Sequence, residues 1–422
     1  MMLNKLKNEL QHFGSQSYNF RVLTLTNLIY SIVLPVIDIF VAAYVMRNSN
    51  DPSKVVVYQL TIYTGIPLTF LLNGWLLNRF PVKLLYSLGM MLSGVSMTIM
   101  MSLKTLDITG VGVAGIVMGM SFGFYWANRD FLALSTTNDN NRNYYYGLET
   151  FFYTIIAVVI PVIIGWFIEL SARAGDAKMA YKMVTGIVFI ITIIASAMCF
   201  RGRFENPVNK KFVFFTFDPY WYKLLFLAAL KGLVQGFLVT APAMLIMLLL
   251  GQEGALGTVQ SIGAIFAAIL MYVIGRLTLP SHRIYVFGLG LLLFAVAAVI
   301  NGILFNATGV ILFMLFLLLA KPLLDLAYFP IQFSVIDLLS KKEKRSEFAY
   351  ILNHETGLYI GRLAGAGTFL LMAYFFSNEI ALRYAIIIVA SLQLCSYWVA
   401  KSIIRQGKEI TQSLNPQPEY HE

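Results

Sequence analysis

Charged side chains are scarce in this chain. Asp, Glu, Lys and Arg make up 12% of its 422 residues, whereas 58% of the residues are hydrophobic and the mean hydropathy is +0.73. Soluble domains carry about 25% charged and about 45–50% apolar residues. This composition excludes a water-soluble fold, and no polar stretch is long enough to form a separate soluble domain.

Cysteines and catalytic motifs are equally scarce. Cys199 and Cys395 both lie in apolar stretches, where a small core side chain is more common than a disulfide or a metal ligand. The His-Glu-x-x-His, paired-cysteine and Gly-x-x-x-x-Gly-Lys patterns of metal, redox and phosphate sites do not occur. We therefore predict neither an enzyme nor an ATP-driven pump, and no cofactor or metal. An intramembrane enzyme without such motifs stays an alternative.

Long apolar runs are what the sequence has instead. A membrane helix needs about 20 apolar residues, and runs of that order recur about twelve times between Arg21 and Arg405. The alternating segments of a membrane β-barrel do not occur. The sequence predicts an all-α integral membrane protein with spans at roughly 21–46, 55–78, 82–103, 107–135, 143–171, 180–200, 220–250, 256–279, 283–304, 308–340, 345–376 and 380–404.

Lys and Arg are distributed unevenly between the connections. Of the 31 Lys and Arg residues, 20 lie on one side of the predicted membrane, seven on the other and four inside spans. Because basic loops stay in the cytoplasm, both termini should be cytoplasmic. The first 20 residues carry no cleavage signal, so the first span should be retained. The basic excess is thus a topology signal, and we expect no nucleic-acid partner.

The longest hydrophilic connection divides the spans six from six. It predicts a cytoplasmic N-terminus at 1–20, a six-helix bundle at 21–200, a cytoplasmic central loop at 201–219, a second six-helix bundle at 220–405 and a cytoplasmic tail at 406–422.

The two halves also resemble each other. Residues 80–89 align without gaps on residues 279–288, a shift of 199 residues. The stretch Glu-Thr-Phe-Phe-Tyr at 149–153 aligns on Glu-Thr-Gly-Leu-Tyr at 355–359, a shift of 206 residues. The similar shifts indicate an internal duplication, which is common in transporter folds.

The connection between the second and third predicted spans reads Gly-Trp-Leu-Leu-Asn-Arg-Phe-Pro-Val-Lys at 74–83. It resembles the signature loop of the major facilitator superfamily, although Asn78 replaces an acid, Pro81 a glycine and Val82 an arginine. With twelve spans and two similar halves, the chain is identified as a member of that family. The resemblance implies two pseudo-symmetric six-helix bundles around a central cavity and alternating access by rocking of the bundles.

The resemblance further implies a latch at this loop. In the family, basic residues of the loop pair with an acid at the cytoplasmic end of the fourth span. Arg129 and Asp130 lie five to six residues before that place, and they could instead satisfy only each other. The expected latch residues are Gly74, Asn78, Arg79, Lys83, Arg129 and Asp130.

Polar residues inside spans are candidates for a substrate site, because an ionisable group at mid-bilayer costs about 2.5–3.5 kcal/mol. By resemblance, spans one, four, seven and ten line the cavity. The expected binding residues on them are Asn27, Ser31, Tyr125, Asn128, Lys231, Gln235, Lys321, Asp325 and Tyr328. Lys321 and Asp325 lie one turn apart and should pair, which leaves Lys231 for a substrate anion or for a carboxylate of the other bundle.

Proton coupling needs a carboxylate that changes its environment between access states. Glu355 lies about 15 Å into its span and its repeat counterpart Glu149 only about 9 Å. We expect the coupling residue among Glu355, Asp38 and Asp325. Permanent pairing of Glu355 with Arg362, or coupling to sodium, stays open.

Prolines and glycines mark the mobile and the closely packed helices. Four prolines should interrupt spans one, seven and ten: Pro35, Pro242, Pro322 and Pro330. Two glycine stripes should allow close helix packing: Gly112, Gly115, Gly119 and Gly123, and Gly357, Gly361 and Gly365. The fifth span reads Ile-Pro-Val-Ile-Ile-Gly at 160–165, a departure from the family's multidrug antiporter motif.

The functional prediction is a secondary active transporter of the plasma or bacterial inner membrane. Its partners should be a small organic solute, protons and the lipid bilayer, and we expect a monomer. The alternatives are an exporter of amphipathic compounds or lipids, and a non-transporting sensor or scaffold on the same fold.

Overall fold

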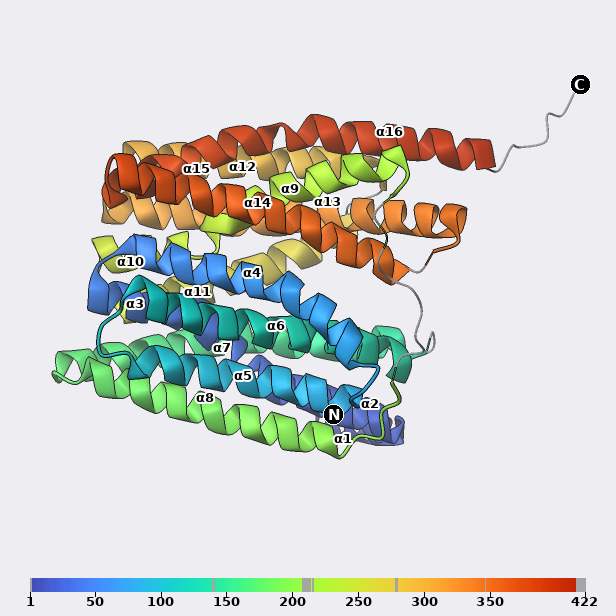
Figure 1. Ribbon diagram of the computed structural model, residues 1–422, viewed down its shortest axis with the longest axis horizontal. Coiled ribbons are helices and arrows are strands. Elements are labelled where there is room, and N and C mark those ends of the chain that lie inside the picture. Colours follow the sequence, from blue (N-terminus) through green and yellow to red (C-terminus); the bar gives the residue numbers. More distant parts are fainter. Residues whose placement is uncertain are drawn as a thin grey trace, which may run out of the picture. The chain divides into compact units, whose positions relative to one another are not determined.

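The computed structural model describes residues 2–138, 141–206, 214, 216–277, 280–345 and 347–414. These residues contain twelve helical segments long and apolar enough to cross a membrane and no strand, so the predicted all-α membrane class is confirmed (Figure 1). The helices are α1 (Met2–Ser15), α2 (Tyr18–Ser31), the π-helical η1 (Val36–Phe40), α3 (Val41–Ser49), α4 (Pro52–Leu76), α5 (Val82–Ser102), α6 (Ile108–Thr136), α7 (Arg142–Arg173), α8 (Ala177–Phe200), α9 (Pro219–Leu238), α10 (Ala241–Leu249), α11 (Glu253–Leu277), the 3-10 turn η2 (Pro280–His282), α12 (Arg283–Ile303), α13 (Ala307–Glu343), α14 (Glu347–Phe375), α15 (Asn378–Leu394) and α16 (Ser396–Leu414).

The chain forms two compact units. The first unit comprises Met1–Asn209 together with Gly251–Ser261, and the second comprises Lys210–Leu250 and Ile262–Glu422. The first turns of α11 therefore pack within the first unit, although they follow α10 in sequence. The cause is that the beginning of α11 approaches α7 closely at Gly165. A Cβ atom at this position would lie 2.5 Å from the Glu253 carbonyl oxygen, so the contact needs a glycine.

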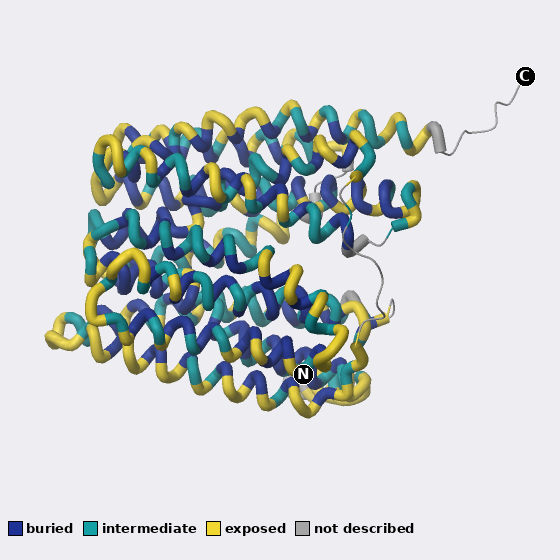
Figure 2. Tube along the Cα trace, in the orientation of Figure 1, coloured by how far each residue is buried: buried dark blue, intermediate teal, exposed yellow. Residues whose placement is uncertain are grey.

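Each unit buries one face of its helices and exposes the other (Figure 2). Buried and exposed residues alternate around the axis of α7, for example, where Phe151 is 60% exposed and Ile168 is fully buried. Exposed apolar side chains of this kind suit a helix that faces lipid, because the bilayer core is as apolar as the side chains themselves.

Short polar side chains begin many of the helices. Asp218 caps α9 by accepting a hydrogen bond from the Tyr220 backbone nitrogen at 2.8 Å, and its other oxygen binds Lys342 Nζ at 2.7 Å. Burial alone would raise the pKa of Asp218, but these hydrogen bonds outweigh burial and lower the pKa below its ordinary value. The cap therefore stays ionised at the positive end of the helix dipole.

All glycines of the two predicted stripes except Gly112 lie at close helix contacts. In the first unit, α4 packs on α6, and a Cβ on Gly123 would meet the Thr69 side chain at 2.5 Å. In the second unit, α9 packs on α14, and a Cβ on Gly361 would fall within 3.0 Å of the Ala229 backbone. Real side chains do not approach this closely, so each contact requires glycine.

Gly361→Ala is expected to lower the stability of the second unit by about 1–3 kcal/mol, because the added methyl group overpacks the contact of α14 with α9. Gly367→Ala is the matched control, since nothing lies within 4 Å of the Cβ position at Gly367 on the same helix. The thermal midpoint of the purified chain in detergent should fall for the first variant and stay near wild type for the second. Equal midpoints would contradict the packing argument.

Prolines break only two of the three predicted spans. Span one divides into α2, η1 and α3 around Pro35, and span seven divides into α9 and α10 just before Pro242. Span ten, however, is one continuous helix through Pro322 and Pro330, so the predicted interruption there was wrong. Neighbouring helices can satisfy the backbone groups that a proline frees in a membrane helix, which allows the helix to continue.

Candidate functional site

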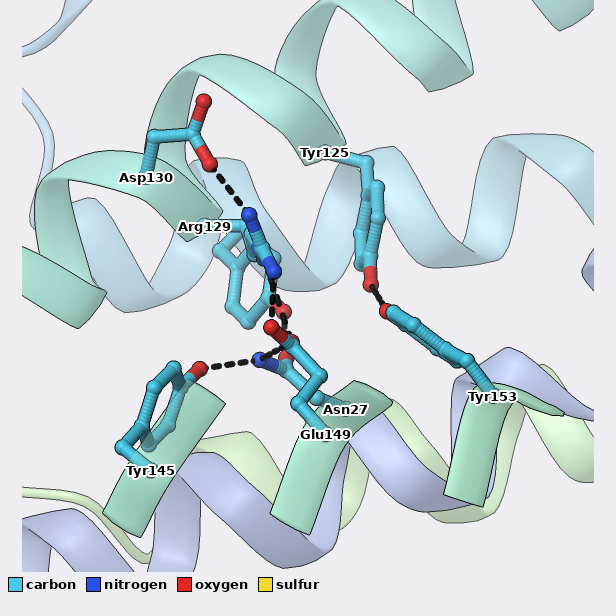
Figure 3. A network of polar contacts seen from close by, with 8 residues as sticks. Asn27, Tyr125, Arg129, Asp130, Tyr145, Glu149 and Tyr153 are labelled. Atoms are coloured by element: carbon cyan, nitrogen blue, oxygen red, sulfur yellow. Dashed lines mark hydrogen bonds and ion pairs between the residues drawn. The ribbon is translucent and has the colours of Figure 1, made fainter. Parts of the chain in front are cut away.

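A buried network in the first unit joins α2, α6 and α7 (Figure 3). Arg129 of α6 binds both carboxylate oxygens of Glu149 on α7, with its Nε donating at 3.2 Å. Asn27 of α2 donates to the same carboxylate at 3.1 Å and to the Tyr145 hydroxyl at 2.6 Å. The Glu149 side chain is 5% exposed and that of Arg129 13%. A carboxylate this buried is stable only when it is paired and hydrogen-bonded.

Tyrosines extend the network on the buried side. The Tyr86 hydroxyl donates to the Asn27 side-chain oxygen, and the Tyr125 and Tyr153 hydroxyls lie 3.2 Å apart. On its outer side, Arg129 also binds Asp130 at 2.6 Å, but the Asp130 side chain is 60% exposed. The predicted binding residues Asn27 and Tyr125 thus come together here, and Glu149 is the centre of the network.

Two further predicted binding residues of the first unit have local partners. Asn128 exchanges hydrogen bonds with Asn73 of α4 at 2.8 and 3.2 Å. Ser31 donates to the backbone oxygen of Leu28 in its own helix at 2.7 Å. These contacts stabilise the helices, and a role for Asn128 or Ser31 in binding stays a prediction.

The second unit holds an ion pair between α9 and α13. Lys231 Nζ lies 2.8 Å from Asp325 and 4.0 Å from the ring centroids of both Tyr328 and Phe329. The expected pairing of Asp325 with Lys321 was therefore wrong. Lys321 is exposed at the surface of α13, whereas the Lys231 side chain is only 15% exposed. A desolvated ammonium gains more from a carboxylate than one that reaches solvent or headgroups.

A second ion pair of this unit lies on α14. Arg362 donates to Glu355 at 3.3 Å and, through Nε, to the Gln235 side chain of α9 at 3.0 Å. The Tyr328 hydroxyl and His354 Nε2 lie 2.6 Å apart. Of the nine predicted binding residues, Lys231, Asp325 and Tyr328 are thus linked on α9 and α13, and Gln235 of α9 binds Arg362 of α14.

The repeat places a glutamate–arginine pair in each unit. Glu149 and Glu355 are equivalent in the alignment of the two halves, and each binds an arginine. The arginine comes from a different helix in the first unit but from the same helix in the second. Glu149 is held by three donors and is 5% exposed, whereas Glu355 has a longer contact and is 25% exposed. Glu355 is therefore the less tightly held carboxylate.

Asn206, which no motif in the sequence singles out, holds the signature loop through its side chain. Asn206 accepts a hydrogen bond from the Val82 backbone nitrogen at 2.8 Å and donates to the Leu77 and Phe80 backbone oxygens. Arg79 stacks on the Trp75 ring at 4.8 Å. Among the described residues neither Arg79 nor Lys83 forms an ion pair, and Arg129 pairs with Glu149 and Asp130. The predicted latch contact is thus not formed here, although Gly74 and Asn78 lie at the expected turn.

Another cluster of the first unit was missed by the sequence interpretation. Arg47 at the end of α3 binds both carboxylate oxygens of Glu253, which is fully buried at the start of α11. Tyr181 of α8 donates to the same carboxylate at 2.9 Å. Charged residues are common at the ends of membrane spans. Their positions in the sequence do not show which of them pair, so only the packing could identify this pair. Asp38, a predicted coupling residue, is exposed in η1.

One formal match to a hydrolase motif does not change the prediction about enzymes. Gly-Met-Ser-Phe-Gly at 119–123 fits Gly-x-Ser-x-Gly, but the motif works on a sharp turn between a strand and a helix. Here Ser121 lies in the middle of α6, fully buried, and donates to the Gly89 backbone oxygen at 2.6 Å. In the described residues no group of three His, Cys, Asp or Glu side chains could hold a metal ion.

Residues 22–366, most of this twelve-span chain, match the family model of the Major Facilitator Superfamily. The chain belongs to this superfamily. The resemblance predicted from the signature loop is therefore confirmed. Membership of the superfamily, together with the twelve candidate spans, makes the chain a multi-pass membrane protein and indicates a transporter rather than an enzyme.

Two relatives in sequence match the chain, one over nearly its whole length and one over part of it. The chain is 22% identical over 416 residues to the uncharacterized protein YqgE of Bacillus subtilis (strain 168). The match covers 96% of this chain and 94% of the relative. It is also 23% identical over 159 residues to an uncharacterized protein in the sodM 3' region of Geobacillus stearothermophilus. This match covers 38% of the chain and 74% of that protein.

Solved structures of transporters share the fold. A bacterial homologue of the iron transporter ferroportin in its inward-facing state has a TM-score of 0.68 at 14% identity, covering 93% of this chain and 99% of the homologue. The nucleoside transporter NupG has a TM-score of 0.66 at 9% identity, covering 92% and 100%. At identities of 14% and 9%, the likeness shows the fold alone and does not identify the substrate.

Proposed function

We propose that this superfamily member is a secondary active transporter that moves a small anionic organic solute together with protons by alternating access. The observation that supports it best is the charge arrangement of the second unit. Lys231 and Arg362 are each neutralised by one carboxylate, Asp325 and Glu355. Neutral pairs avoid the cost of an isolated charge in the membrane.

Proton uptake would change this balance in a way that favours anion binding. A proton on Glu355 removes the partner of Arg362, and the exposed charge of the guanidinium then attracts a carboxylate or phosphate of the solute. The proton and the anion enter together, so the buried site remains close to neutral. Release of the solute and of the proton from Glu355 would restore the pair of Arg362 with Glu355. Of the two glutamates equivalent in the repeat, Glu355 suits this exchange because it is the less tightly held.

Alternating access also requires contacts that open and close. We infer that the pair of Arg47 with Glu253 is such a contact, since it ties the beginning of α11 to α3 while the rest of α11 belongs to the second unit. The breaks near Pro35 and Pro242 give spans one and seven points at which they can bend. Both termini are proposed to be cytoplasmic, in the plasma or bacterial inner membrane, and the transporter is proposed to be a monomer.

Glu355→Gln is expected to abolish accumulation driven by a pH gradient while preserving exchange of labelled solute. The amide mimics the protonated carboxyl, so the solute can still bind but no proton is released in the cycle. Proteoliposomes with and without an imposed pH gradient would separate the two activities. Candidate anions can be identified in the same proteoliposomes, because a transported anion either collapses the pH gradient or accumulates inside in response to it.

Glu379→Gln is the matched control, because Glu379 lies exposed in the first turn of α15. It should leave both activities near wild type. Gradient-driven accumulation at the wild-type rate by Glu355→Gln would exclude Glu355 as the coupling residue. Asp325 would then be the leading candidate.

A further inference from the structure

A groove on the second unit lies between the first turns of α9 and the first turns of α16. It encloses about 490 Å³ and is lined by Tyr222, Lys223, Phe226, Trp398, Val399 and Ser402. The Tyr220 hydroxyl donates to the Ile403 backbone oxygen at 2.8 Å and holds the two helices together beneath it. The groove is thus formed by two helices in fixed contact.

The groove has one polar end and an apolar wall. Lys223 Nζ donates to the Ser402 hydroxyl at 3.2 Å, and among the described residues no carboxylate pairs with Lys223. An ammonium group has three donors, so Lys223 can bind a further acceptor. The wall consists of Tyr222, Phe226 and Trp398, which are 49%, 55% and 66% exposed. Three exposed aromatic side chains beside one cation suit an amphipathic anion.

The depth of these residues matches the layers of a bilayer. Pro219 begins the apolar segment of span seven, so Lys223 lies about 6 Å and Phe226 about 10 Å along the helix from its start. Aromatic and basic side chains near the ends of spans lie at the level of the lipid headgroups. The cation therefore lies where lipid phosphates are, and Phe226 lies where acyl chains begin.

Further positive charge lies on α16 at the same end. Lys401 precedes Ser402 and is exposed, and the Arg405 side chain lies one turn beyond Ser402 and is 84% exposed. Arg405 pairs with Glu409 at 3.1 Å, whereas among the described residues Lys401 forms no ion pair. Juxtamembrane basic side chains attract anionic lipids by about 1 kcal/mol each.

We propose that this groove binds one anionic phospholipid, with its phosphate on Lys223 and Ser402 and an acyl chain along Phe226 and Trp398. The apolar wall favours a lipid over a free phosphate ion, because inorganic phosphate would leave the aromatic side chains without a partner. Lys231 lies two turns further along the same helix α9. A lipid held at the start of α9 can therefore influence the ion pair of Lys231 with Asp325.

The test uses the purified full chain in detergent, with phosphatidylglycerol and phosphatidylcholine as probes and native mass spectrometry as the readout. Wild type should retain phosphatidylglycerol preferentially. Lys223→Ala should reduce that preference about tenfold, which corresponds to one charge-assisted hydrogen bond. Lys223→Gln keeps most of the side chain but removes its charge, so it should reduce the preference by a similar factor. Trp398→Ala should reduce retention of both lipids.

Lys104→Ala is the matched control, because Lys104 is an exposed lysine of the first unit. It should keep the wild-type preference. An unchanged preference in both Lys223 variants would overturn the proposal. Competition by millimolar inorganic phosphate would also overturn it, since the groove would then bind the free anion and not a lipid.

Discussion

Lys231→Ala is expected to reduce transport by about 100-fold or more without loss of the folded protein. The Lys231 ammonium lies 2.8 Å from the Asp325 carboxylate and 4.0 Å from the centroid of the Tyr328 ring, and its side chain is 15% exposed. Removing a buried charge that binds an oppositely charged group costs about 2–5 kcal/mol. Uptake of a labelled anion into proteoliposomes, at matched protein density, measures the loss.

The double variant Lys231→Ala with Asp325→Ala tests whether Lys231 binds solute or only its partner. If Lys231 served structure alone, removal of both charges would leave no unpaired group and transport would recover. We expect the double variant to remain inactive, since the solute anion has lost Lys231, one of the two cations of the site beside Arg362. Lys341→Ala, at the exposed end of α13, should transport normally. Recovery in the double variant would contradict the binding role.

Arg129→Leu is expected to destabilise the first unit by about 3–5 kcal/mol, because it leaves the Glu149 carboxylate buried and without its cation. Glu149 is 3% exposed overall and would keep only the hydrogen bond from Asn27. Thermal unfolding in detergent should show a much lower midpoint and a reduced yield of monodisperse protein. Asp130→Asn, which affects the exposed partner of Arg129, should change stability by less than about 1 kcal/mol.

A second substitution should reverse most of this loss. Arg129→Leu combined with Glu149→Gln removes both charges and keeps an amide that can accept from Asn27. Its midpoint should lie well above that of Arg129→Leu alone. If the double variant were as unstable as the single one, the network would depend on the arginine for packing and not for its charge.

The amino-acid sequence by itself determined the membrane class, the number of spans and the helix contacts that need glycine. These features depend on local properties, namely the apolar length of each run and the missing side chain of a glycine such as Gly361. The breaks of spans one and seven are also local, because Pro35 and Pro242 lack a backbone N–H group. The degenerate loop at 74–83, together with the twelve spans and the two similar halves, was sufficient to indicate the superfamily. The equivalence of Glu149 and Glu355 could also be predicted, because a duplication preserves spacing along the chain.

Only the tertiary structure decided which charged groups meet. Helical spacing predicts that Asp325 should bind Lys321, yet Asp325 binds Lys231, which is 94 residues away in sequence. The pair of Arg47 with Glu253, 206 residues apart, had no local signal at all. Pairing depends on how each helix is rotated and on which cation is desolvated by its neighbours. Those quantities arise only when the helices pack, so spacing within one helix cannot determine them.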